Sequence, residues 1–488
     1  MKTFYLETYG CQMNEADSEL VTGRLLEAGY RKVESPGEAD IILANTCAVR
    51  EHAEQRVVGR LNELGRHKLQ RPGVILGVLG CMSQHLKEGL LKQVGRLDLV
   101  AGPDSYRRLP ALIEEATNAP RLDCDLDRAE TYAGLEPVRT EGVRAWVTIL
   151  RGCDKFCSFC IVPHVRGRER CLPADAILAE VREVVRQGFK EVVLLGQTVN
   201  SYQHDGVSFA ELLRKVNAVE GIERIRFTSP YPTDMTDDAI AAMAECEHVC
   251  PHLHLPLQSA ADAVLERMRR GYTIAEYDAL VHRLRVTIPD LALGTDLIVG
   301  FPDETEAEYQ ATLDYVKSGR FDSAFMFKYS PRPGTLSARW DDTVPEEVKS
   351  RRLQEVIDTQ EGISKEINQA LIGREVEVLV EGRARRGDTD ASGKTPHFKT
   401  VVFPDGGSKP GDLVTVEVER ATGHSLYGRL LPGRLRHRRH SHGGSTEFAG
   451  RSPHEGPVLR RAIRAKLDAM VSAPQRSLSL IPLEVADR

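Results

Sequence analysis

Short apolar runs alternate with amphipathic stretches through the first quarter of the chain. Strand-like runs occur at residues 3–6, 41–44 and 74–79. Stretches with helical periodicity lie between them, and in residues 18–28 the apolar side chains recur on one face. This alternation predicts a small parallel α/β sheet, which we place at residues 1–123.

The same alternation resumes on a larger scale after a polar segment that we interpret as a linker. Helical stretches separate six strand-like runs, at residues 146–150, 192–195, 225–228, 253–257, 293–299 and 324–329. Six consecutive βα units fit an open barrel as well as a doubly wound sheet, and the pattern does not decide between them. We place this α/β unit at residues 145–370.

The remaining chain has a different composition. Short β-type runs separated by Gly, Asp and Pro predict a small all-β barrel at residues 371–432. After Pro432 the pattern ends, and a dense basic run at residues 434–440 precedes a stretch rich in Gly, Ser and Pro. We expect this basic tail, residues 433–488, to be disordered.

Composition narrows the class of protein. The 488 residues are 41% hydrophobic and 28% charged, as in ordinary soluble proteins, and the net charge of −6 argues against non-specific coating of nucleic acid. No long apolar run and no signal-peptide pattern are found, so we expect no membrane segment and a cytoplasmic location. In that compartment the ten cysteines are better explained as metal ligands or small buried residues than as disulfides.

Three cysteines stand close together directly after the first strand of the larger α/β unit. Cys153, Cys157 and Cys160 have the spacing Cys-x3-Cys-x2-Cys. Three thiolates on one loop can ligate three irons of a [4Fe–4S] cube and leave the fourth iron open, which suits catalysis. The alternatives are a zinc knuckle that lacks its fourth ligand, or chance clustering.

This spacing, with the aromatic Phe159 before the last cysteine, resembles the signature of the radical S-adenosylmethionine (SAM) superfamily. The resemblance implies a partial six-unit βα barrel. It also implies that SAM chelates the open iron, and that one electron cleaves SAM to methionine and a 5′-deoxyadenosyl radical.

Three further cysteines, Cys11, Cys47 and Cys81, are far apart in the sequence but occupy equivalent places. Each ends or follows a predicted strand of the N-terminal sheet. Parallel strands bring their carboxyl ends to one edge, so the three thiols can converge and hold a second cluster with an open iron. The alternative is that small buried cysteines happen to lie at strand ends.

Together the two cysteine groups resemble the methylthiotransferase family over roughly residues 1–431. That family has an N-terminal cysteine domain, a radical SAM barrel and a C-terminal RNA-binding β-barrel, the TRAM domain. The branch that modifies tRNA bearing N6-dimethylallyladenosine resembles this chain in blocks 10–14, 17–19, 45–47, 229–232, 254–259 and 329–335. Tyr231 departs from the pattern, because a histidine is expected at that position.

The resemblance implies a reaction at carbon 2 of the adenine ring. One SAM methylates a sulfur on the second cluster, another SAM is cleaved at the first cluster, and the methylthio group replaces a hydrogen of the nucleobase. We therefore expect two [4Fe–4S] clusters, SAM, tRNA and an electron donor such as flavodoxin or ferredoxin, in a monomeric enzyme. Two alternatives remain open: the same chemistry on N6-threonylcarbamoyladenosine tRNA or on a ribosomal protein, and an RNA-binding iron–sulfur redox sensor without catalysis.

Cofactor contacts beyond the cysteines follow from strand position. The family's SAM contacts would fall on Phe159, Gly196, Gln197, Ser229, Asp296 and Gly300. Loop geometry or capping hydrogen bonds would explain the same residues. Arg166, Arg168 and Arg170 would bind tRNA phosphates or the SAM carboxylate, or form a solvated face.

Several other residues have simpler explanations or a role in RNA binding. Loops of the predicted β-barrel carry basic residues that suit an RNA backbone, namely Arg383, Arg385, Arg386, Lys394, His397 and Lys399. Composition alone would favour solvent-facing loops with ordinary charges, whereas the family resemblance favours RNA binding. Phe398 or Phe403 could stack on a base, although Phe403 fits the core better. We expect His252 and His254 to share one side of a strand as a hydrogen-bonded pair, and we interpret the remaining four cysteines, Cys124, Cys171, Cys246 and Cys250, as structural.

Overall fold

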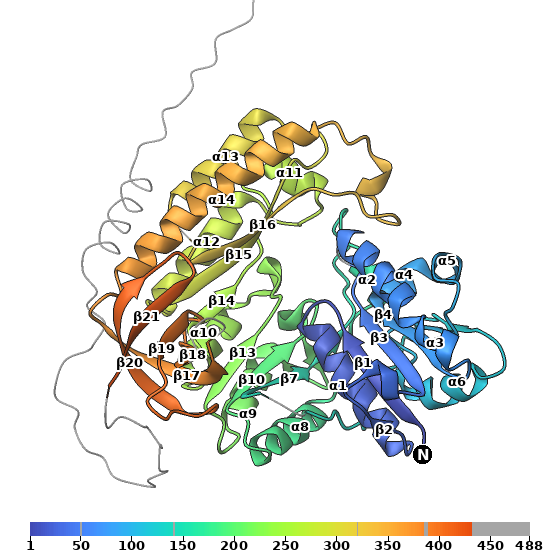
Figure 1. Cartoon of the computed structure of the whole chain (residues 1–488). Coiled ribbons are helices and arrows are strands. Elements are labelled where there is room, and N and C mark those ends of the chain that lie inside the picture. Colours follow the sequence, from blue (N-terminus) through green and yellow to red (C-terminus); the bar gives the residue numbers. More distant parts are fainter. Residues whose placement is uncertain (49–50, 140–141, 320, 385–388, 432–488) are drawn as a thin grey trace, which may run out of the picture. The chain divides into compact units, whose positions relative to one another are not determined.

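The structure is a computed structural model that describes residues 1–48, 51–139, 142–319, 321–384 and 389–431 (Figure 1). The predicted tail at residues 433–488 and two of the predicted RNA contacts, Arg385 and Arg386, lie outside the described residues. Among the described residues, no helix is both long and apolar enough to cross a membrane.

The N-terminal part contains a six-stranded parallel sheet in the order β2-β1-β3-β4-β5-β6. Its strands are β1 (Thr3–Thr8), β2 (Arg31–Lys32), β3 (Ile41–Thr46), β4 (Ile75–Gly80), β5 (Leu99–Ala101) and β6 (Arg121–Asp123). Its main helices are α1 (Gln12–Glu27), α2 (Glu51–Leu64), α4 (Cys81–Leu86), α5 (Glu88–Gln93) and α6 (Leu109–Glu115). The predicted parallel α/β sheet is confirmed, and the sequence pattern missed only its short strands.

Burial on both faces explains the apolar strands of this sheet. Every residue of β3 and β4 is buried, and alternate residues of β3 enter two different cores. Ile41 and Leu43 pack with α1 residues, whereas Ile42 and Ala44 pack with α2 residues. The strand order reverses at β1, so the crevice between β1 and β3 is the topological switch point where open α/β sheets bind ligands.

The middle part is a partial βα barrel. Its strands are β7 (Arg144–Thr148), β10 (Glu191–Leu195), β13 (Arg224–Phe227), β14 (His252–His254), β15 (Ala292–Val299) and β16 (Ser323–Lys328). They form two parallel ladders, β13-β10-β7 and β14-β15-β16, which a parallel bridge between Ile225 and Val249 connects. The strands follow one another in chain order without a reversal, so the barrel, and not the doubly wound sheet, is the correct alternative.

The barrel's helices begin where the sequence provides caps. They are α8 (Ala174–Arg186), α9 (Phe209–Asn217), α10 (Asp237–Glu245), α11 (Asp262–Arg267), α12 (Ile274–Thr287) and α13 (Glu306–Lys317). Complete capping boxes start α9, α12 and α13, with Ser208, Thr273 and Thr305 as the first members. The long helix α14 (Glu346–Gln369) runs beside α13 and β16 (Figure 1).

The C-terminal part is a closed five-stranded β-barrel, as predicted. Its strands are β17 (Glu375–Arg383), β18 (Asp390–Lys394), β19 (Thr400–Pro404), β20 (Leu413–Ala421) and β21 (Ser425–Leu430), in the order β17-β18-β19-β21-β20. Phe403 is fully buried in its core, which confirms that this ring does not stack on RNA.

The small barrel contacts the amino ends of the radical-barrel strands. Arg144, the first residue of β7, reaches Glu381 at 2.7 Å, and Arg226 of β13 donates to the carbonyl oxygen of Thr395 at 2.8 Å. Between these arginines lies the fully buried carboxylate of Glu191, which forms ion pairs with both. The small barrel therefore lies at the end opposite the carboxyl ends that precede the cysteine loop.

Replacement of Glu191 by glutamine should destabilise the fold by about 3–5 kcal/mol, because two buried guanidinium groups would lose their counter-charge. Burial by itself would raise the pKa of Glu191, but the charges of Arg226 and Arg144 outweigh it and lower the pKa below the ordinary value. Its stabilising contribution is thus complete above the ordinary pKa of an unfolded glutamate and is lost as the pH falls through the lowered folded value.

Urea unfolding of Glu191→Gln at several pH values measures this effect. Glu183→Gln is the matched control, since Glu183 pairs with Arg186 on the exposed face of α8 and its replacement should leave the free energy of unfolding nearly unchanged. Equal, small losses in the two variants would show that the buried carboxylate does not stabilise the barrel.

Candidate active site

The radical cysteines lie on the loop between β8 (Leu150–Arg151) and α7 (Val162–Arg166). Two hydrogen bonds fix the start of this loop. The Gly152 N–H donates to Gln197 Oε1 at 2.5 Å, and the Cys153 N–H donates to the carbonyl oxygen of Gly167 at 3.1 Å. Gln197 follows β10, so the neighbouring barrel strand helps to hold the loop.

The environment of these thiols suits a metal cluster. Burial raises the pKa of Cys153 to about 11 and that of Cys160 to about 12, so neither thiol would ionise without a positive partner. Arg270 lies 3.4 Å from Cys157 Sγ, and the Lys155 N–H lies at the same distance from Cys153 Sγ. Iron would supply the missing positive charge, so the donor set fits a [4Fe–4S] cluster.

Among the described residues, no three His, Cys, Asp or Glu side chains are arranged to hold one metal ion. A cube binds each cysteine through a different iron and does not require that arrangement.

The second cysteine group surrounds the switch point of the N-terminal sheet. Cys11 precedes α1, Cys47 follows β3, and Cys81 begins α4. Gly10 has a φ of +130°, and a Cβ atom there would lie 2.5 Å from Cys47 Cβ. Only glycine therefore allows the backbone before Cys11 to pass this close to Cys47.

The electrostatics of this group differ from those of the radical loop. A hydrogen bond with Cys47 lowers the pKa of Cys11 to about 6, against the effect of burial and with help from the charge of Arg166. Cys81 is buried, which raises its pKa, and Arg166 Nε donates to its Sγ at 3.2 Å. Arg166 thus places one positive charge close to two of the three thiols.

A buried amide network joins the first two strand ends. Asn45, next to Cys47 in sequence, donates to the Asn14 carbonyl oxygen at 2.9 Å and to Ser18 Oγ at 3.0 Å. The Asn14 side chain in turn lies 3.4 Å from Cys11 Sγ. These contacts explain why the polar residues beside the cysteines are buried in α1 and β3.

The two cysteine groups adjoin each other. Cys81 and Ala48 share a small apolar cluster with Ile161 and Val165, which directly follow the radical cysteines. Arg332 donates to the Ala48 carbonyl oxygen at 2.6 Å. One region of the molecule therefore contains six cysteines from two separate sheets.

The three arginines after the radical loop do not form one solvated face. Arg166 and Arg170 are buried and pair with Asp17 and Asp104, each at 2.8 Å. Arg168 is the exposed member and pairs with Asp154. The solvated face was therefore wrong for Arg166 and Arg170, because a sequence does not reveal which acidic partner the fold supplies.

The remaining predicted SAM contacts have these places. Phe159 packs edge-on against Phe301, and Gly196 follows β10 in close contact with Val199. The exposed Ser229 follows β13 with a left-handed φ of 57°. A side chain at Gly300 would collide with Lys349 of α14.

Asp296 takes part in a feature that the sequence analysis missed. Its Oδ1 lies 3.1 Å from His254 Nε2, and the Phe325 ring packs 5.6 Å from the His254 ring. Ala324 and Met326 pack toward the helices, so Phe325 faces the barrel interior, yet its side chain is 63% exposed. The alternation of inward-facing and outward-facing side chains along β16 could have predicted that Phe325 faces the barrel interior.

The predicted RNA contacts of the small barrel are partly engaged within the chain. His397 pairs with Asp290 at 3.3 Å and Lys399 with Asp322 at 3.3 Å. Phe398 stacks on His252 with ring centroids 5.0 Å apart. His252 and His254 therefore do not pair with each other but with partners from different elements, which corrects our expectation.

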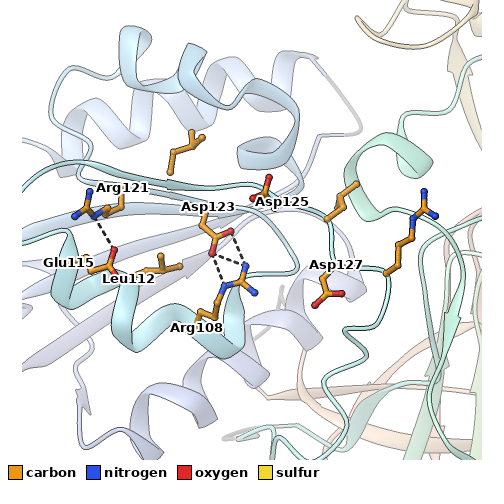
Figure 2. Close-up of a pocket in the computed structure, with 10 residues that line it drawn as sticks. Arg108, Leu112, Glu115, Arg121, Asp123, Asp125 and Asp127 are labelled. Carbon is orange, nitrogen blue, oxygen red and sulfur yellow. Dashed lines mark hydrogen bonds and ion pairs between the residues drawn. The ribbon is translucent and has the colours of Figure 1, made fainter.

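A surface pocket of about 590 Å³ lies at the outer edge strand β6 (Figure 2). Arg108 and Asp123 form an ion pair at 2.8 Å in its wall, and Arg121 pairs with Glu115 (Figure 2). None of the six cysteines lines it.

Family profiles match three consecutive parts of the chain. Residues 3–102 match the uncharacterized protein family UPF0004, residues 147–316 the radical SAM superfamily, and residues 369–431 the TRAM domain.

Curated relatives match 88% of the chain. Two are named tRNA-2-methylthio-N(6)-dimethylallyladenosine synthase: one from Pelodictyon phaeoclathratiforme, 46% identical with 98% of its length covered, and one from Acetivibrio thermocellus, 47% identical with 91% covered. A relative of the same name from Porphyromonas gingivalis is 44% identical, with 95% of its length covered.

Solved structures share the fold at low identity. The radical SAM methyltransferase TsrM from Kitasatospora setae has a TM-score of 0.54 and 13% identity, over 69% of this chain and 74% of TsrM. The cobalamin-dependent radical SAM enzyme OxsB has a TM-score of 0.51 and 13% identity, over 73% of this chain and 56% of OxsB.

Gly10→Ala should remove about half of the bound iron if each cysteine group holds one cluster, because the new Cβ would push Cys11 away from Cys47. Iron and sulfide analysis after anaerobic reconstitution measures the loss. Gly29→Ala is the control, since Gly29 has a similar φ of +84° but open space around its Cβ position. Full iron in Gly10→Ala, or loss of all iron, would contradict the geometry described for the second group.

Proposed function

This chain belongs to the family of the tRNA-2-methylthio-N(6)-dimethylallyladenosine synthases, which are radical SAM methylthiotransferases, and from that membership we infer its reaction. It transfers a methylthio group to carbon 2 of N6-dimethylallyladenosine next to the tRNA anticodon. The observation that carries this function is the placement of two cysteine groups side by side at the ends of parallel strands. A redox sensor would not require that arrangement, and the names of the relatives favour the dimethylallyl substrate over the threonylcarbamoyl one.

The radical SAM part uses SAM and a [4Fe–4S] cluster, and we propose Cys153, Cys157 and Cys160 as its ligands. When bound, the cluster supplies the electron that cleaves SAM to methionine and a 5′-deoxyadenosyl radical. Arg270, buried 3.4 Å from Cys157 Sγ, stabilises the negative charge of that ligand. Gln197 holds the loop through the Gly152 N–H.

We propose that Cys11, Cys47 and Cys81 hold a second [4Fe–4S] cluster. Two observations support it: the close approach of Cys11 to Cys47, and the guanidinium of Arg166 at the Cys81 sulfur. A thiol with a lowered pKa, such as Cys11, is a ready metal ligand.

SAM would lie along the carboxyl ends of the barrel strands. We propose that its contacts include Phe159, Gly196, Gln197, Ser229, Asp296 and Gly300. The left-handed backbone of Ser229 supports a ligand role there, because strained loop residues concentrate at functional sites.

The inner face of β16 offers an apolar surface for the substrate. We propose that Phe325 contacts the dimethylallyl group, since an exposed ring beside the His254–Asp296 pair combines apolar surface with polar atoms for the adenine edge. The small barrel would bind the RNA backbone.

We propose a cytoplasmic monomer that receives electrons from a flavodoxin or a ferredoxin. We place its functional parts at residues 1–123, 145–370 and 371–432, with a basic tail at 433–488.

Anaerobic incubation of the reconstituted protein with reductant, SAM and tRNA containing N6-dimethylallyladenosine tests the reaction. Nucleoside mass spectrometry should detect the methylthio product together with 5′-deoxyadenosine. Cys153→Ala should abolish both products, whereas Cys11→Ala should abolish only the methylthio product and keep 5′-deoxyadenosine. Absence of both products from wild-type protein that contains iron would favour the sensor alternative.

Phe325→Ala should lower kcat/KM for the dimethylallyl tRNA about 10-fold, which corresponds to the loss of one buried aromatic contact of roughly 1.5 kcal/mol. Its effect on tRNA that lacks the dimethylallyl group should be much smaller. Val286→Ala is the control, because Val286 is also 63% exposed but lies on α12, outside the barrel strands. A similar loss with both tRNAs would assign Phe325 a general structural role.

A further inference from the structure

The carboxylate of Asp17 in α1 connects the two cysteine groups. Its Oδ1 accepts from Arg151 and its Oδ2 from Arg166, each at 2.8 Å. Arg151 ends β8, two residues before Cys153, and Arg166 ends α7, six residues after Cys160. One side chain of the N-terminal part therefore holds both ends of the radical loop.

The same contact reaches the second cysteine group. Arg166 Nη2 binds Asp17 while its Nε donates to Cys81 Sγ at 3.2 Å. The planar guanidinium fixes the two contacts relative to each other, so the position of α7 determines where the charge lies at Cys81. Asp17, Arg151 and Arg166 are all buried, which leaves little freedom for alternative partners.

Aromatic rings close the remaining sides of this cluster. The Arg151 guanidinium lies 4.6 Å from the centre of the Tyr132 ring, which stacks on Tyr106 at 5.5 Å. The Tyr106 hydroxyl approaches Asp17 Oδ2 at 3.4 Å. Such an arrangement holds the carboxylate in one orientation, because each of its oxygens already has a short contact with a guanidinium.

We propose that Asp17 is a positioning residue that fixes the radical loop against the N-terminal cysteines, so that hydrogen removal and methylthio transfer act on one bound nucleobase. The proposal rests on the proposed function and adds a residue to it. Asp17 contacts no thiol directly, so its effect passes through Arg151 and Arg166. Loss of this contact should separate the two half-reactions without removing any cysteine.

The chain offers a matched control in the Arg170–Asp104 pair. This pair is also buried, also has a 2.8 Å contact, and also joins the N-terminal part to the strand after α7, but it contacts no cysteine sulfur in the described structure. Arg170 also donates to the carbonyl oxygen of Arg166 at 2.8 Å, a backbone contact that Asp104→Asn keeps because Arg170 remains in place. Asp104→Asn should therefore have the general cost of a broken buried ion pair and leave the geometry between the cysteine groups intact.

The experiment compares Asp17→Asn, Arg166→Lys and Asp104→Asn with the wild type. In the reconstituted enzymes, the ratio of 5′-deoxyadenosine to methylthio nucleoside should rise at least 10-fold in the first two variants and stay unchanged in Asp104→Asn. Arg166→Lys keeps the charge but loses the planar guanidinium that contacts Asp17 and Cys81 together. This variant therefore still tests the proposal if Asp17→Asn does not fold.

Hydrogen exchange on the apoproteins supplies a readout that is independent of activity. The amides of α7 should exchange about 10-fold faster in Asp17→Asn and Arg166→Lys than in Asp104→Asn. Unchanged product ratios, with both products falling in proportion to stability in all three variants, would overturn the proposal. A wild-type enzyme that makes no methylthio nucleoside would refute the proposed function instead, and the exchange data would still test the contact.

Discussion

A carboxylate buried between two guanidinium groups is stable only when both contacts form together, since each lone charge would be expensive to desolvate. Asp17 is in this position between Arg151 and Arg166. Asp17 comes from the N-terminal part and the two arginines from the barrel part, so the contact exists only when these parts meet in one orientation. The proximity of Cys81 to the radical loop depends on this orientation, and so does the positive charge at its sulfur.

The N-terminal sheet and the barrel both place cysteines after the ends of parallel strands, but with different numbers of loops. In each, the proposed ligand cysteines follow the carboxyl ends of parallel strands, where loops can vary without disturbing the core. The N-terminal sheet gathers three cysteines from three loops at its switch point, whereas the barrel carries three on a single loop. Because the three N-terminal cysteines come from three different loops, more contacts are needed to hold these loops together. This explains the tight Gly10 turn and the buried amides of Asn14 and Asn45.

Periodicity and spacing predicted most of the architecture, because strands such as β3 and β15 are long, apolar and bounded by clear turns. Short strands such as β2 and β6 were missed, since two or three residues carry no period. The cysteine groups could be predicted from residue type and position. Ion pairs between distant parts of the chain could not be predicted. Arg166 pairs with Asp17, which lies 149 positions earlier, and no local pattern in the sequence indicates that contact.

The small β-barrel lies at the amino ends of the radical-barrel strands, through Arg144, Arg224 and Arg226, while the cysteines lie at the carboxyl ends. A strand of five residues, such as β10, spans roughly 16 Å at about 3.3 Å per residue. If the small barrel binds the RNA, only a nucleotide at a fixed distance from the bound nucleotides would therefore reach the cysteines. Substrate choice would then depend on length along the RNA as well as on the chemistry of the base. A nucleobase with the correct modification at the wrong distance from the nucleotides bound by the small barrel would not react.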